Sequence, residues 1–173
     1  MGRSHILAVA ILGAWIMATL GMWFAATRSF ATVERVMKGE EPQFVETTKP
    51  LAEASTRLVV RYTAAEINRS LFHGYGALQI GLGAILFLLV WLQKPRNAFD
   101  LGLVTAMLLL AVILTVGITP LVTTLGRSID FLPRNPPLPV MPRFRALHAT
   151  FTALDGAKLL AGIGLLVRWM FRG

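Results

Sequence analysis

The sequence has no cysteine and few charged residues. The absence of cysteine excludes disulfide bonds, thiolate zinc sites and a cysteine nucleophile. Only 15% of the residues are charged, whereas soluble domains carry roughly a quarter. Hydrophobic residues, in contrast, make up 55% of the chain. This imbalance indicates that the folded chain has lipid as its solvent.

Known catalytic motifs are also missing. The chain has no G-x-S-x-G nucleophile elbow, no H-E-x-x-H zinc motif and no phosphate-binding P-loop. We therefore predict that the protein is not an enzyme and holds no metal. Its formal net charge of +8 would suggest nucleic acid as the partner of a soluble protein. Here the basic residues mostly flank apolar runs, so we expect contact with membrane lipids and no nucleic acid.

Four apolar runs are long enough to cross a bilayer, which takes about 20 residues in helical form. They cover residues 6–26, 74–93, 101–125 and 146–167. Since lipid cannot pair with backbone polar groups, such runs must be helices. The sequence predicts an all-α, integral membrane four-helix bundle that forms one domain over residues 1–173. The first run is longer than the roughly 7–15 apolar residues of a signal peptide, so we expect it to be retained.

The segment between the first two spans, residues 27–73, still has a helical pattern. Glu53 and Arg57 are four residues apart, the spacing that supports an exposed helix, and an apolar stripe runs beside them. Residues 39–42 are typical of a turn, and Thr48 is typical of the start of a helix. We therefore expect the first two spans to continue beyond the membrane as a helical hairpin.

The other connections differ. Residues 94–97 form a short turn that makes the second and third spans antiparallel neighbours. The connection 131–143 is rich in proline, which predicts an extended, non-helical segment at the surface. Pro120 is expected to kink or loosen the end of the third span.

The orientation in the membrane stays open. More basic residues lie on the side of the two long connections, which favours a cytoplasmic location for that side, but Arg3 beside the first span favours the opposite. We expect the protein to lie in the plasma (inner) membrane of a bacterium.

Asp155 and Lys158 fall near the middle of the fourth span. A single charge at that depth costs roughly 2.5–3.5 kcal/mol, but a pair three residues apart can meet on one helix face. One interpretation is a mutually neutralised pair that faces the bundle interior and bonds to Gln79 or a threonine. The other is a proton or ion relay that also uses His148 and Thr152, which precede Asp155 on the same helix.

Two histidines are expected at a similar depth, near one membrane interface. His73 opens the second span and His148 lies near the start of the fourth. Neutral imidazoles so placed could ligate haem or a chlorophyll-type pigment, although the sequence requires no cofactor. The alternative is that both are polar anchors at the interface.

Small residues recur at the spacing that lets membrane helices approach closely. We expect helix packing at six of them: Ala14, Ala18, Ala77, Gly81, Ala157 and Ala161.

The chain resembles the family of four-helix membrane proteins known as transmembrane protein 205-like, or domain of unknown function 4149. The resemblance rests on Phe144, Leu147 and His148 at the start of the fourth span, with Asp155 where the family favours asparagine. Phe72 near the start of the second span and the region of Pro120 at the end of the third also fit. It implies a compact four-helix bundle without an established catalytic activity.

Three functions are compatible with these features. The first is a non-enzymatic accessory or assembly subunit of a larger membrane protein complex. The second is a small proton- or ion-coupled transporter that uses Asp155, Lys158 and His148. The third is a carrier of haem or pigment that uses His73 and His148.

Overall fold

The computed structural model describes residues 3–132 and 138–171. Over these residues the protein is all-α, with no strand, and four helical segments are long and apolar enough to cross a membrane. The predicted fold class is confirmed. The segments are α1 (Arg3–Met37), α3 (Glu53–Leu92), the continuous run of α4 (Ala98–Val112), η1 (Ile113–Ile118) and α5 (Thr119–Ser128), and α6 (Met141–Met170).

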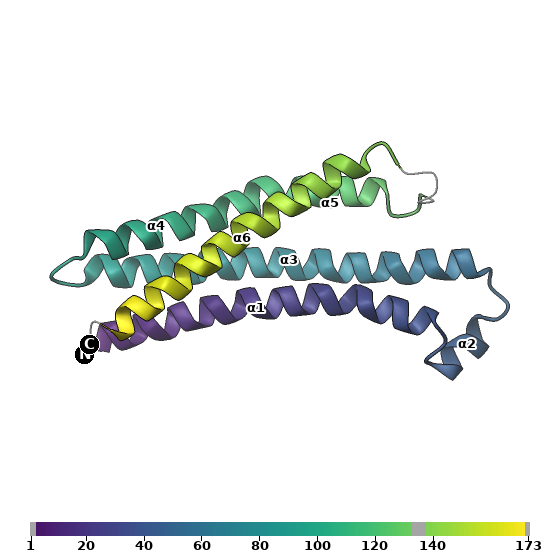
Figure 1. The fold of residues 1–173 in the computed structure, drawn as a ribbon, viewed down its shortest axis with the longest axis horizontal. Coiled ribbons are helices and arrows are strands. Elements are labelled where there is room, and N and C mark those ends of the chain that lie inside the picture. Colours follow the sequence, from purple (N-terminus) through teal and green to yellow (C-terminus); the bar gives the residue numbers. More distant parts are fainter. Residues whose placement is uncertain (1–2, 133–137, 172–173) are drawn as a thin grey trace.

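The helices are arranged as an elongated bundle (Figure 1). α1 and α3 pack along each other, and α6 crosses the bundle diagonally with contacts to α1, α4 and α5. The turn between α3 and α4 ends at Asn97, whose side chain accepts a hydrogen bond from the backbone N–H of Asp100 at 3.1 Å. This N-cap and the acidic residue in the first turn both stabilise the start of α4.

α1 and α3 are much longer than a membrane crossing needs. Their 35 and 40 residues correspond to about 52 and 60 Å, against a hydrocarbon core of about 30 Å. The excess lies at the end where α1 stops and α3 starts. There Arg57 donates to Glu34 of α1 at 3.2 Å and also pairs with Glu53 at 3.5 Å. We call this part, residues 27–73, the hairpin extension.

The tip of the hairpin extension differs from the prediction. A short helix, α2 (Pro42–Thr48), stands between the two long ones. The expected turn precedes it, with Gly39 at a φ of +84°, which glycine adopts without strain. Thr48 does not start the next helix: its hydroxyl donates to the carbonyl of Phe44 at 2.8 Å and so closes α2. The chain enters α3 only at Glu53.

The third span is continuous but widened before Pro120. Residues 113–118 form a turn of π-helix, and the hydroxyl of Thr119 donates to the carbonyl of Leu114 at 2.8 Å. A proline has no N–H to donate, and its ring clashes with the carbonyl four residues earlier in a regular helix. The wider turn relieves that clash, so the predicted loosening occurs without a break.

The proline-rich connection is shorter than predicted. α6 begins at Met141, so Pro142 lies in its first turn. The N–H groups of that turn have no acceptor within the helix, so a proline there costs no hydrogen bond. Pro133, Pro136 and Pro137 lie outside the described residues.

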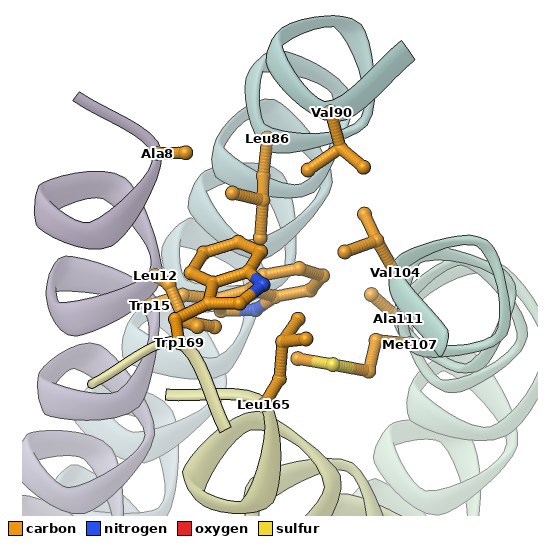
Figure 2. Close-up of a cluster of buried hydrophobic side chains, with 10 residues drawn as sticks. All are labelled: Ala8, Leu12, Trp15, Leu86, Val90, Val104, Met107, Ala111, Leu165 and Trp169. Atoms are coloured by element: carbon orange, nitrogen blue, oxygen red, sulfur yellow. The ribbon is translucent and has the colours of Figure 1, made fainter. Parts of the chain in front are cut away.

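The main apolar core lies at the end of the bundle that holds the two termini. It contains the indoles of Trp15 and Trp169 together with apolar side chains from all four spans (Figure 2). The ten buried members are Ala8, Leu12, Trp15, Leu86, Val90, Val104, Met107, Ala111, Leu165 and Trp169. A second, smaller cluster of Met22, Tyr75, Leu114 and Phe151 lies further toward the hairpin extension.

Candidate functional site

The two intramembrane charges face the bundle interior and meet. Asp155 is 0% exposed and Lys158 is 2% exposed, and Oδ1 of Asp155 lies 2.6 Å from Nζ of Lys158. Because residues three apart share one face of a helix, both side chains point from α6 toward α1 and α3. The pair is therefore shielded from lipid.

Every N–H of the Lys158 ammonium has an acceptor. Besides Asp155, the ammonium donates to Oε1 of Gln79 at 2.7 Å and to the hydroxyl oxygen of Tyr75 at 3.1 Å. An ammonium has three donors and no acceptor, so three bonds exhaust its capacity. No N–H is left over to bind an ion or a substrate.

Asp155 is held from three directions. The phenol of Tyr75 lies 2.9 Å from Oδ1 and 3.1 Å from Oδ2, and the indole N–H of Trp23 donates to Oδ2 at 2.8 Å. With Lys158, the carboxylate thus has partners from α1, α3 and α6. Such charge-assisted bonds are shorter and stronger than neutral ones.

Gln79 extends the network back to α1. Its Oε1 accepts a hydrogen bond from the indole of Trp15 as well as from Lys158. Its amide nitrogen lies 3.4 Å from the carbonyl of Trp15 and 3.5 Å from the hydroxyl of Thr19. We call these seven residues the buried polar network: Trp15, Thr19, Trp23, Tyr75, Gln79, Asp155 and Lys158.

The buried polar network closes the middle of the bundle. The main apolar core lies beside it in one direction and the cluster around Phe151 in the other. The small cavity that adjoins Gln79 and Lys158 measures about 10 Å³, room for one water at most. A network of this kind, with its donors and acceptors paired, locks three helices in one arrangement.

Two predicted members lie outside the network. His148 is exposed, stacks on Phe144 with ring centroids 6.1 Å apart, and lines a separate cavity. The Thr152 hydroxyl donates to the carbonyl of His148 at 3.0 Å within its own helix. The helical spacing placed both near Asp155 along the axis, but the contacts of each lie with residues outside the network.

The two predicted cofactor ligands do not share a cavity. His73 is exposed on α3, beside the inward-facing Phe72, and it does not line the cavity that His148 lines. Among the described residues, moreover, no group of three His, Asp or Glu side chains could hold a metal ion. The geometry gives the haem or pigment interpretation no support.

Four of the six predicted packing positions need correction, because Ala14, Ala77, Gly81 and Ala157 are exposed. Ala18 and Ala161 do pack against the two apolar clusters. The close approaches between helices instead occur at glycines that lie on another face of the helix. A Cβ on Gly76 would lie 2.6 Å from Thr115, and one on Gly83 would lie 2.8 Å from Trp15. Small residues are so common in membrane helices that their spacing alone did not show which face was buried.

Four members of the network were missed by the sequence analysis: Trp15, Thr19, Trp23 and Tyr75. A signal for them exists. Trp15, Thr19 and Trp23 follow one another at intervals of four residues and therefore share one face of the first span. Tyr75 and Gln79 share one face of the second span in the same way. Each of these polar faces could meet the charged pair on the fourth span.

Ion pairs also fix the bundle at both ends. At the end of the termini, Oδ1 of Asp100 accepts from Arg168 at 2.8 Å, and its Oδ2 accepts from the indole of Trp169 at 3.0 Å. Within the hairpin extension, Arg69 binds Glu66 on its own helix and reaches Asp130 after α5, the latter at 2.8 Å. These contacts join α4 to α6 and α3 to α5.

Comparison with known proteins identifies part of the chain. Residues 52–129 match the model of the family described as Domain of unknown function (DUF4149), so the resemblance seen in the sequence is confirmed for this segment. The match covers less than half of the chain and extends from the start of α3 to the end of α5. No curated protein and no solved structure matches the chain.

Proposed function

We propose that this membrane protein is a non-enzymatic accessory or assembly subunit of a larger membrane protein complex in the plasma membrane of a bacterium. The observation that carries the proposal is the hairpin extension, which projects an apolar surface beyond the depth of a bilayer.

The hairpin extension is too long to be immersed in lipid together with the spans. α3 alone exceeds the hydrocarbon thickness by about 30 Å, and its first turns carry Glu53, Arg57 and Arg61, which lipid would not tolerate. This part of the molecule therefore stands in water or against another protein.

The surface of the hairpin extension is nevertheless apolar in places. Val59 is 59% exposed, and Leu51 and Ile67 are exposed to a similar degree. Val33 and Val36 of α1 join Val59 and Ile67 in lining a groove of about 350 Å³ between the two helices. Exposed apolar surface outside the membrane is typical of a protein–protein contact, and a groove between helices suits an apolar helix of a partner.

The interior supports a structural role over transport. The charges that a transporter would use are committed to one another: Lys158 has three acceptors, and Asp155 has donors on three helices. Moving an ion through the bundle would require this network and the apolar clusters beside it to open together.

Substitution on the hairpin extension tests the proposal. The Val59→Arg variant places a charge in the groove, and Ser55→Arg, at an exposed position on the same helix outside the groove, is the matched control. Native gels of membranes in mild detergent should show the wild type and Ser55→Arg in a species much larger than 18.9 kDa, and Val59→Arg as a small species.

A wild-type protein that migrates alone under these conditions would contradict the proposal. So would a Val59→Arg variant that remains in the large species. The far-UV circular dichroism of purified Val59→Arg should equal that of the control, which separates loss of the partner from loss of the fold.

A further inference from the structure

α6 is the least apolar of the four membrane-spanning segments. Asp155 and Lys158 lie near its middle, and the stretches on either side of them, residues 146–154 and 159–167, are each too short to cross a bilayer. The span therefore has to carry both ions through the hydrocarbon, where charge is strongly unfavourable. The composition of α6 thus opposes the crossing that the folded structure requires.

The two ions neutralise each other in part, and their remaining bonds come from α1 and α3. Nζ of Lys158 donates to Gln79 at 2.7 Å and to Tyr75 at 3.1 Å, and both acceptors lie on α3. Oδ2 of Asp155 accepts a hydrogen bond from the indole of Trp23 on α1 at 2.8 Å. Among the described residues, the third span contributes no hydrogen bond to either ion.

The groups that receive the ions are also held in place by contacts between α1 and α3. The hydroxyl of Tyr75 lies 3.1 Å from that of Thr19, and Gln79 bonds to both the indole and the carbonyl of Trp15. These bonds do not involve α6, and the contact between α1 and α3 is the most extensive in the bundle. Both helices precede α6 in the chain, so they can pair first and present a polar face to it.

We propose that α6 is a conditional span, which crosses the membrane only because the paired α1 and α3 receive its two ions. Without that polar face, α6 stays on the side of the hairpin extension and the chain crosses the membrane three times. The end of α6 then lies on the opposite side from the start of α1. This inference concerns the topology of the chain and does not depend on a partner in the groove of the hairpin extension.

Single cysteines can report the side of the membrane, because the chain has none of its own. Three exposed positions serve as reporters: Ser4 in α1, Phe171 after α6, and Ser55 in the hairpin extension. The start of α1 and the end of α6 lie at the same end of the bundle (Figure 1). In the wild-type background, Ser4→Cys and Phe171→Cys should therefore lie on one side of the membrane and Ser55→Cys on the other.

The full-length proteins are synthesised in vitro into inverted membrane vesicles of a bacterium, where degradation in the cell plays no part. A membrane-impermeant maleimide is added before or after the vesicles are opened with detergent. A cysteine on the outer face is labelled in both samples, and a cysteine on the inner face only in the second. The assay thus compares the three reporters with one another, whichever orientation the protein adopts.

The test variant combines Trp23→Phe, Tyr75→Phe and Gln79→Leu, which removes every hydrogen bond from α1 and α3 to the two ions at similar side-chain volume. In this background, Phe171→Cys should move to the side of Ser55→Cys in about half of the molecules or more, because charge at the centre of the bilayer opposes insertion. The reporter at the start of α1 should keep its side.

Two controls separate loss of the polar face from loss of the fold. Leu86→Ala weakens the main apolar core but leaves every partner of the ions in place, so Phe171→Cys should keep its wild-type side. Adding Asp155→Leu and Lys158→Met to the test variant makes the middle of α6 apolar, and the wild-type labelling should return. A test variant that merely misfolded would not recover in this way.

Three results would overturn the proposal. If Phe171→Cys kept its side in the test variant, the ion pair would neutralise itself well enough for α6 to cross alone. If the two apolar substitutions in α6 did not restore the crossing, the ions would not be what keeps α6 out. Equal displacement by Leu86→Ala would show that packing in general holds α6 across the membrane.

Discussion

The phenol of Tyr75 lies between the two intramembrane ions, 2.9 Å from Oδ1 of Asp155 and 3.1 Å from Nζ of Lys158. It can donate to the carboxylate and accept from the ammonium at the same time. Tyr75 therefore joins α3 to the ion pair of α6, and the pair becomes part of the contact between helices instead of a feature of one helix.

Replacing Asp155 by Asn should destabilise the protein by about 3–5 kcal/mol, because the Lys158 ammonium would stay buried without its counter-charge. Unfolding of the purified protein in detergent by sodium dodecyl sulfate measures this. The double variant Asp155→Leu, Lys158→Met removes both charges and should be more stable than the single one. A single variant as stable as the wild type would show that the pair is not buried.

Replacing Tyr75 by Phe should cost about 1–3 kcal/mol, since Asp155 and Lys158 each lose one hydrogen bond in the interior. Tyr62→Phe is the matched control. Tyr62 lies on the hairpin extension, and the centroid of its ring is 4.7 Å from that of Phe131, a contact that phenylalanine keeps. Its effect should stay within about 0.5 kcal/mol. Equal effects of the two changes in the same assay would count against the bridging role of Tyr75.

Two glycines two residues apart on α3 should respond differently to alanine. At Gly83 the new Cβ would lie 2.8 Å from Trp15 and 2.9 Å from Leu108, and overpacking of this kind costs about 1–3 kcal/mol. At Gly81 it would meet nothing within 4 Å, so Gly81→Ala should be neutral or stabilise the helix by up to about 1 kcal/mol. Melting temperatures of the two variants decide the matter. The reverse order would mean that Gly81, as the sequence suggested, faces a neighbouring helix.

The ion pair near the hairpin extension should also contribute to stability. Asp130→Asn weakens a bond to Arg69, whose side chain is only 11% exposed, and should cost about 1.5–3 kcal/mol. Lys49→Gln breaks the pair with Glu46, in which both side chains are well exposed, and should cost at most about 1 kcal/mol. Chemical denaturation of both variants tests the difference, and a larger loss for Lys49→Gln would refute it.

The sequence alone determined that the protein is built from four membrane-spanning helices. A bilayer leaves an apolar run of about 20 residues no other structure, so the long stretches without charge were sufficient evidence. The same argument required Asp155 and Lys158 to face inward, and their spacing put them in contact. Pro120 likewise predicted a disturbance of its helix, because the ring and the missing N–H act on the nearest turn.

Only the tertiary structure decided which side chains those two ions meet and which small residues are buried. Tyr75 and Trp23 reach Asp155 because α1 and α3 present those faces to α6, and the rotation of a helix about its axis depends on all of its neighbours. For the same reason Gly83 packs on Trp15 while Gly81 is exposed. In lipid the apolar pattern is nearly uniform around each helix, so the sequence carries little information on rotation and the packing itself decides it.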